Sequence, residues 1–136
     1  MEIAFFHWPA VLVCIISNMV IGALWYSPVL FGTIWLKLVN RQSGDIDTKE
    51  ARSSMALSII PAILSVLTLA VLLGLTGAST PMEGILVASL VSVGFVGMSA
   101  LNLVFFENRS LALTLLNTGY FFTALNVAAL ILTLWK

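Results

Sequence analysis

Charged residues are what this sequence has least of. Only 9% of its 136 residues are charged, and 60% are hydrophobic, whereas a soluble domain carries about a quarter charged residues. Water cannot solvate most of such a surface, so the expected environment is the lipid bilayer. Six basic and six acidic residues give a formal net charge of zero. The composition therefore predicts no nucleic-acid partner.

Residues that commonly bind metals or carry redox chemistry are almost missing as well. Cys14 is the only cysteine and His7 is the only histidine. Within one copy this excludes a disulfide, a multi-cysteine cluster and the two-histidine metal motifs. The sequence shows no nucleophile paired with a base and no phosphate-binding loop. We therefore expect no cofactor, no metal ion and no enzymatic activity.

Long hydrophobic runs dominate the chain instead. A helix needs roughly 20 apolar residues to cross about 30 Å of hydrocarbon, and its backbone groups must be paired there. Four charge-free runs qualify, namely Trp8 to Tyr26, Met55 to Leu75, Ile85 to Phe106 and Leu111 to Trp135. We predict an all-α integral membrane protein, a single domain over residues 1–136 that forms a four-transmembrane-helix bundle. The expected spans are about 8–27, 53–76, 82–106 and 110–135.

Helix start signals lie at the ends of these runs. Thr80-Pro81-Met82-Glu83 combines the spacing of a capping box with a proline at the first helical position. Asp47, with Glu50 three residues later, is a second start signal and places the first turn of the second span in water. The connection at 107–110 is so short that the third and fourth spans must form an antiparallel hairpin.

The stretch after the first span allows two interpretations. Apolar residues recur there at helical spacing, at Leu30, Phe31, Ile34, Trp35 and Leu38. The pattern predicts either a short helix along the headgroup boundary or a continuation of the first span with a kink at Pro28.

All but one of the six basic residues lie on one side of the predicted bundle. The exception is Lys136, which lies on the other side. The side rich in Lys and Arg usually faces the cytoplasm, so loops 37–52 and 107–110 are expected to be cytoplasmic and both termini to be outside. The basic side carries Lys37, Arg41, Lys49, Arg52 and Arg109.

Small and polar residues form a stripe on every span, and two interpretations stay open. In lipid, such stripes usually pack helices together and form hydrogen bonds between them. The candidate packing residues are Gly22, Ser65, Ser92, Ser99, Gly119 and Asn126. Alternatively, the stripes line a polar cavity. The candidates for that lining are Asn18, Asn102, Asn117 and Tyr120. At α-helical spacing, Ala88, Ser92, Ser99 and Asn102 are expected to share one face of the third span.

Glu107 is a separate candidate, because a carboxylate at the membrane boundary is costly unless it is paired or hydrated. Its obvious partner is Arg109. The pair is either a solvated feature of the hairpin or part of a proton or cation site. In the second case Trp25, Tyr26 and Ser27 lie at the same depth on the first span.

Two motifs carry a resemblance to a known family. The first is Trp25-Tyr26-Ser27-Pro28 and the second is Asn117-Thr118-Gly119-Tyr120. With them, the chain resembles a bacterial family of small multi-pass membrane proteins that is catalogued only as a domain of unknown function. The resemblance implies a bacterial origin and assigns no activity. The expected location is the bacterial inner membrane. We hypothesise that the two motifs meet in the cytoplasmic half of the bundle.

The small size of the predicted bundle guides the expectation about function. One four-helix bundle buries too little for a transport pathway of its own, so we expect a homo-oligomer. The leading hypothesis is a small permease- or channel-like protein for an ion or a small solute, with the asparagines lining the path. The alternative is an accessory or scaffolding subunit that packs against other subunits of a larger membrane complex.

Overall fold

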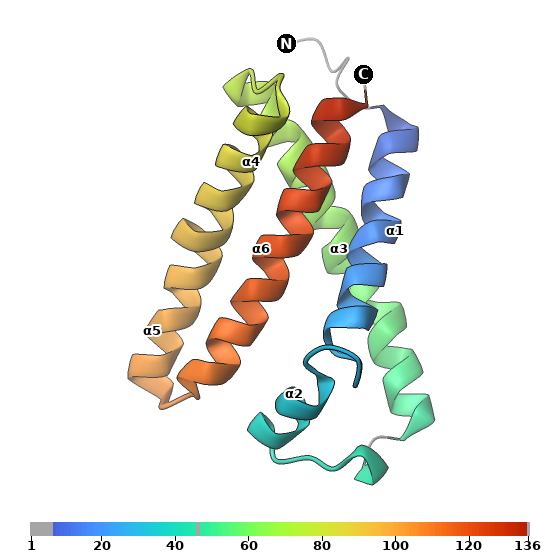
Figure 1. The fold of residues 1–136 in the computed structure, drawn as a ribbon, viewed down its shortest axis with the longest axis vertical. Coiled ribbons are helices and arrows are strands. Elements are labelled where there is room, and N and C mark those ends of the chain that lie inside the picture. Colours follow the sequence, from blue (N-terminus) through green and yellow to red (C-terminus); the bar gives the residue numbers. More distant parts are fainter. Residues whose placement is uncertain (1–6, 46, 136) are drawn as a thin grey trace.

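The computed structural model describes residues 7–45 and 47–135. Figure 1 shows the long helices side by side, with the start of α1 and the end of α6 at one end of the bundle and α2 at the other. The elements in chain order are α1 (Trp8–Trp25), α2 (Gly32–Leu38), the 3-10 turn η1 (Ser43–Asp45), α3 (Thr48–Thr76), α4 (Pro81–Leu90), the π-helix η2 (Val91–Gly97), α5 (Met98–Glu107) and α6 (Leu111–Leu134).

Four helices among the described residues are long and apolar enough to cross a membrane. They are α1, α3, α6 and the continuous helix Pro81–Glu107 that comprises α4, η2 and α5. The predicted all-α fold with four spans is therefore confirmed. The α3 helix begins at Thr48, several residues before its apolar run, because the Asp47 side chain accepts a hydrogen bond from the Lys49 amide and caps it.

The other helix ends follow from local chemistry in the same way. Thr80 and Glu83 form the predicted capping box at the start of α4. The Ser110 hydroxyl caps α6 by accepting from the amide of Leu113. Asn108, with φ 53°, makes the left-handed turn that separates α5 from α6. These short connections leave neighbouring spans antiparallel.

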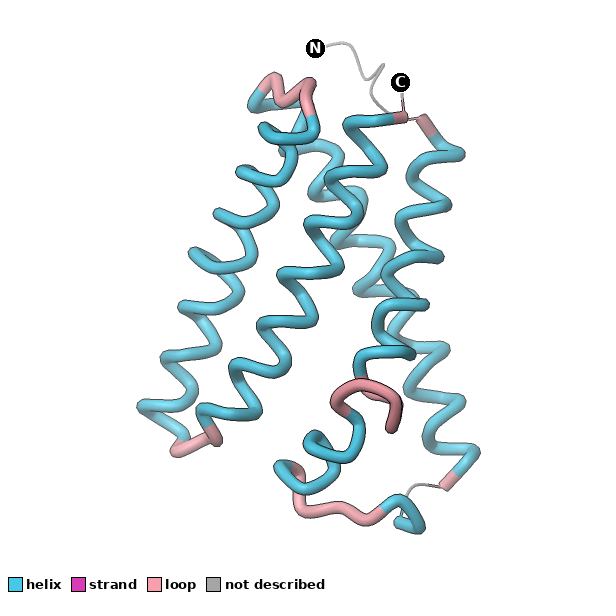
Figure 2. The backbone as a smooth tube through the Cα atoms, in the orientation of Figure 1, coloured by secondary structure: helices cyan, strands magenta, loops and turns pink. Residues whose placement is uncertain are grey.

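A separate short helix follows α1, so the kinked continuation is not what the structure shows. The chain turns back on itself between Trp25 and Gly32, where Figure 2 shows a loop. The Phe31 amide donates to the Trp25 carbonyl at 3.0 Å, and the Gly32 amide donates to the Ser27 carbonyl at 2.8 Å. Only glycine allows this approach, because a Cβ at Gly32 would lie 2.5 Å from the Ser27 carbonyl carbon.

The centre of the bundle is α6, which packs against α1 on one side and α4 on the other (Figure 1). Its buried residues Ala124, Ala128 and Ala129 are small, which lets the neighbouring backbones approach closely. On the α1 side, the Cys14 thiol lies 3.5 Å from the Ala128 carbonyl oxygen. On the α4 side, Gly84 faces Ala129. Small residues therefore hold three helices together.

The third span does not keep the register that an α-helix would give it. Within η2 the turns are wider than in an α-helix, which rotates the residues that follow. Ser92 is completely buried and Gly97 is buried beside Thr118. Ser99 and Asn102 are exposed. The structure therefore does not place Ser99 and Asn102 on the Ser92 face, and this expectation is corrected.

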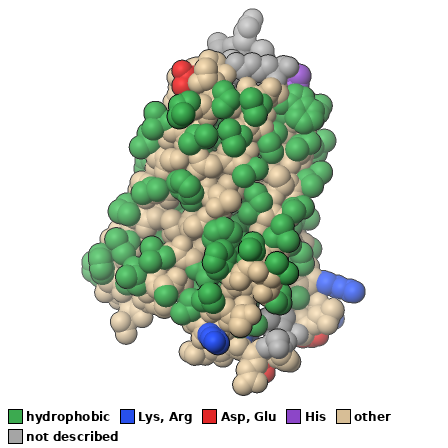
Figure 3. Space-filling model, viewed as in Figure 1, with side chains coloured by type: hydrophobic (Ala, Val, Ile, Leu, Met, Phe, Trp, Pro, Cys, Tyr) green, Lys and Arg blue, Asp and Glu red, His purple; other side chains and the backbone are tan. Residues whose placement is uncertain are grey.

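The outside of the bundle is apolar. Large hydrophobic side chains such as Ile16, Leu64, Phe95 and Leu115 are more than half exposed. Figure 3 shows hydrophobic side chains over most of the visible face, with Lys and Arg only toward the end where α2 lies. A surface of this kind is suited to lipid rather than to water.

The α4–α6 contact predicts the effect of adding one methyl group. A Cβ at Gly84 would lie 2.8 Å from the Thr133 Cγ2 atom and 3.3 Å from the Ala129 carbonyl oxygen. We expect Gly84→Ala to destabilise the protein by about 1–3 kcal/mol through overpacking. The measurement is the midpoint of unfolding in mixed detergent micelles.

The matched control is Gly94→Ala in the same span, because a Cβ there would meet no atom within 4 Å. That variant should be neutral or slightly more stable, since alanine is the better helix former. Equal stability of the two variants would contradict the close contact of α4 and α6.

Candidate functional site

The two sequence motifs meet where α1 ends. The Trp25 indole donates from Nε1 to the Leu116 carbonyl oxygen at 3.1 Å. The Tyr26 hydroxyl donates to Asn117 Oδ1 at 2.7 Å. Gly119 leaves room for the Trp25 ring, because a Cβ there would lie 3.1 Å from Trp25 Cζ2. The geometry therefore agrees with the hypothesis that residues 25–28 and 117–120 come together in one half of the bundle.

A second hydrogen bond joins the same two helices farther from the end of α1. The Tyr120 hydroxyl donates to Asn18 Oδ1 at 2.6 Å, and Asn18 is only 6% exposed. Gly22 lets the ring lie across α1, since a Cβ at this position would be 3.3 Å from the Tyr120 hydroxyl oxygen. Tyr120 also lies beside Tyr26, with ring centroids 5.7 Å apart. An aromatic layer therefore joins α1 to α6.

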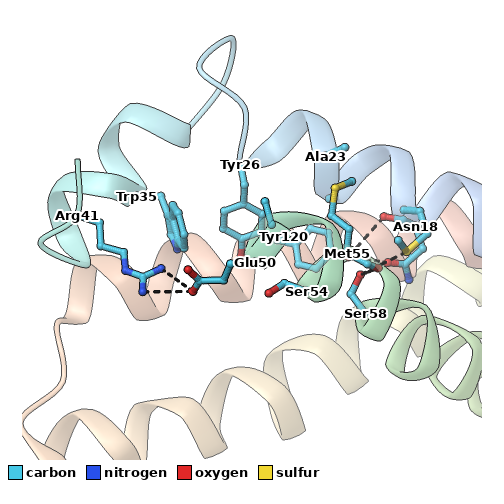
Figure 4. A pocket seen from close by; sticks show the side chains of 13 residues that line it. Asn18, Ala23, Tyr26, Trp35, Arg41, Glu50, Ser54, Met55, Ser58 and Tyr120 are labelled. Atoms are coloured by element: carbon cyan, nitrogen blue, oxygen red, sulfur yellow. Dashed lines mark hydrogen bonds and ion pairs between the residues drawn. The ribbon is translucent and has the colours of Figure 1, made fainter. Parts of the chain in front are cut away.

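This layer forms one wall of a cavity of about 530 Å³. The first half of α3 forms the opposite wall. All residues at 52–61 are exposed, whereas the second half of α3 contributes to the core. Pro61, the proline inside α3, stands at the boundary between the two halves. Figure 4 shows the lining side chains, which are Asn18, Met19, Gly22, Ala23, Tyr26, Trp35, Arg41, Glu50, Ala51, Ser54, Met55, Ser58 and Tyr120.

An ion pair lies at one end of the cavity. Both terminal nitrogens of Arg41 are 3.4 Å from the same Glu50 oxygen, Oε1. The two side chains are 46% and 51% exposed. Such a long and half-exposed pair contributes little to stability. Figure 4 shows the pair next to Trp35, on the α2 side of the cavity. This end of the cavity, which is called its mouth below, is therefore held only weakly by the ion pair.

The interior of the cavity is mostly apolar, with a few hydroxyl groups. Met19 and Met55 supply flexible thioether side chains. The Ser58 hydroxyl donates to the Met55 carbonyl at 2.7 Å and lies 3.8 Å from the Met19 sulfur. Ser54 lines the cavity one turn nearer the mouth. An apolar cavity with a few convergent polar groups is the usual form of a small-molecule site.

The structure gives the predicted polar residues different positions relative to the cavity. Asn18, Tyr26 and Tyr120 line the cavity. Trp25 and Asn117 stand behind them and hold them in place. The Ser27 hydroxyl instead donates to the Leu24 carbonyl in the turn after α1.

Three other candidates lie elsewhere. Glu107 and Arg109 pair with each other at 2.7 Å in the α5–α6 turn, and both are exposed. They are not among the residues that line the cavity, and neither is the exposed Asn102. The site within the described residues is therefore on the α1–α3 side of the bundle, away from the hairpin.

The packing candidates have equally different environments. Gly22 and Gly119 receive the aromatic rings, as described above. Ser92 is buried and donates to the Ala88 carbonyl. Asn126 joins α6 to α4 by accepting from Ser89 at 3.2 Å. Ser65 is half-buried.

Sequence reasoning missed the mouth of the cavity. It treated Arg41 as a topological charge and Glu50 as a helix start signal, and Trp35 only as part of an apolar stripe. One local signal was available, because Ser54 and Ser58 lie one turn apart on α3 and face the same side. The other residues come together only through the fold.

Four apolar spans with an apolar exterior and a cavity between them define a multi-pass α-helical membrane protein. The chain belongs to the family described as protein of unknown function DUF1761, whose model matches residues 9–133. This confirms the resemblance inferred from the two motifs. Comparisons with curated proteins and with solved structures gave no match.

The contact between the motifs predicts an energetic coupling. Tyr26→Phe and Asn117→Ala each remove one side of the same hydrogen bond. In a double-mutant cycle we expect a coupling of about 1 kcal/mol, the usual size for such bonds between membrane helices. Unfolding in mixed micelles gives the four free energies.

The control cycle combines Tyr26→Phe with Asn126→Ala, because Asn126 bonds to Ser89 and to Phe122 instead. That cycle should be additive. A coupling of zero in the first cycle would show that the Tyr26–Asn117 hydrogen bond does not stabilise the contact between the two motifs.

Proposed function

We propose that this chain is the subunit of a small permease, which binds a small, mainly apolar solute in the α1–α3 cavity and carries it across the membrane. One observation supports the proposal above all. The cavity of about 530 Å³ lies within the range of about 300–1,000 Å³ that small-molecule sites occupy. Its groups suit binding rather than catalysis, and we propose no enzymatic activity.

The packing around the cavity favours a carrier over an open pore. Beyond Asn18, the space between α1, α3 and α6 is filled by Cys14, Val66 and Leu69, all 2% exposed or less. Among the described residues, this packed layer separates the cavity from the far end of the bundle. Passage would then require the helices to move and open the cavity to each side in turn.

We further propose that the protein works as a homo-oligomer in a bacterial inner membrane. The α2 end carries Lys37, Arg41, Lys49, Arg52 and Arg109, and the positive-inside tendency assigns this end to the cytoplasm. Both termini are then outside, and the cavity opens first toward the cytoplasm.

Cysteine accessibility tests the proposal. In a Cys14→Ala background, Ser58→Cys places a thiol inside the cavity. Sealed vesicles of known orientation are treated from either side with a charged methanethiosulfonate reagent, which does not cross lipid. A carrier predicts that Ser58→Cys is labelled from both sides, because the cavity is exposed to each side in turn.

Two exposed positions calibrate the assay. Gln42→Cys, between α2 and α3, should be labelled only from the cytoplasmic side, and Ser79→Cys, between α3 and α4, only from the other side. If Ser58→Cys is always labelled from the same single side as Gln42→Cys, the cavity is a static pocket and the permease proposal is wrong.

The second candidate function is an accessory subunit. It is favoured by the exposed polar residues Ser99 and Asn102, together with Gly94, on the outer side of η2 and α5. Such residues serve well as contacts to another membrane helix. That helix would belong to a larger complex.

Native mass spectrometry after gentle release from the membrane separates the two candidates. The permease proposal predicts assemblies that contain only copies of this chain. Unrelated subunits present in a fixed ratio would favour the accessory function.

A further inference from the structure

We infer that the solute is an organic cation with an apolar body, held by the Tyr26, Trp35 and Tyr120 rings and by the Glu50 carboxylate. This inference rests on the proposed function and specifies its substrate class. These four side chains are called the cation cage below. All of them line the cavity, and they come from the end of α1, from α2, from α3 and from α6 (Figure 4).

The rings of the cation cage are set at steep angles to one another. Tyr26 and Trp35 have centroids 5.7 Å apart and an interplanar angle of 69°. Tyr26 and Tyr120 are also 5.7 Å apart, at 60°. All three rings line the same cavity, so one guest can contact more than one of them. Ring faces attract cations and not anions, because the aromatic quadrupole is negative over the face.

The Glu50 carboxylate adds a full negative charge beside these rings. Only one of its oxygens, Oε1, is paired, and both contacts from Arg41 are long. No described residue bonds to Oε2, which is available to a guest. The thioethers of Met19 and Met55, which also line the cavity, are soft and polarisable surfaces for the apolar body.

Arg41 acts in this arrangement as a built-in competitor for Glu50. The Arg41 side chain is 46% exposed, so its guanidinium can move into water when a cationic guest takes its place. Substitution of the two residues of the pair should therefore have opposite effects on cation binding. Removing Glu50 weakens cation binding, and removing Arg41 strengthens it.

The test uses three probes of similar shape and different charge: benzyltrimethylammonium, the neutral isostere neopentylbenzene and the anion benzylsulfonate. Dissociation constants are measured by equilibrium dialysis against the full chain in nanodiscs, with empty nanodiscs subtracted. We expect the cation to bind about tenfold more tightly than the neutral probe, as several ring contacts and one carboxylate imply.

Variants of Glu50 and Arg41 test whether each charge raises or lowers the affinity for the cation. Glu50→Gln should weaken binding of the cation about fivefold or more and leave neopentylbenzene unchanged. Arg41→Gln should strengthen binding of the cation about threefold. Both positions are half-exposed, so neither variant should unfold the protein. Glu107→Gln is the matched control, because this carboxylate pairs with Arg109 outside the cavity.

Three other outcomes of the binding measurements would each contradict a different part of the proposal. If benzylsulfonate binds best and Arg41→Gln abolishes its binding, the site takes anions and the inference is wrong. If all three probes bind equally, the charge of the solute is not recognised. Ser54→Trp should fill the cavity and abolish binding there. If no probe shows binding that is lost in this variant, the proposed function itself is wrong.

Discussion

Close approach of small residues along α6 is the contact on which the rest of this structure depends. In lipid, helices gain nothing from hiding apolar surface from one another, so packing and hydrogen bonds must hold them together. Ala124, Ala128 and Ala129 are almost completely buried, and they bring α1 and α4 against the central helix. The larger side chains are left to face the membrane.

The cavity is a consequence of where this close packing stops. The second half of α3 joins the core through Val66, Leu69 and Leu73. Its first half, at 52–61, does not. In that half of the bundle α1 and α6 are held together by aromatic side chains that bond to Asn18 and Asn117. Aromatic rings fill the α1–α6 contact and leave the α3 side open.

Much of the fold follows from the sequence, because the constraints that produce it are local. A charge-free run of about 20 residues can only be a span, and Thr80 with Glu83 fixes the start of a helix. The π-helix of η2 is different. α-Helical spacing does not apply across Val91–Gly97, so the register of Ser99 and Asn102 could not be predicted from it.

The candidate site was predictable only in part, for a similar reason. Asn18, Tyr26 and Tyr120 could be found because an amide or a phenol within a span needs a partner. Arg41 and Glu50 carry no such signal, since charges in a loop and in a first helical turn are ordinary. The chain first folds back at Gly32 onto the Ser27 carbonyl, and α2 then leads to Arg41. The meeting of Arg41 and Glu50 at the cavity therefore depends on the path of the backbone rather than on any motif.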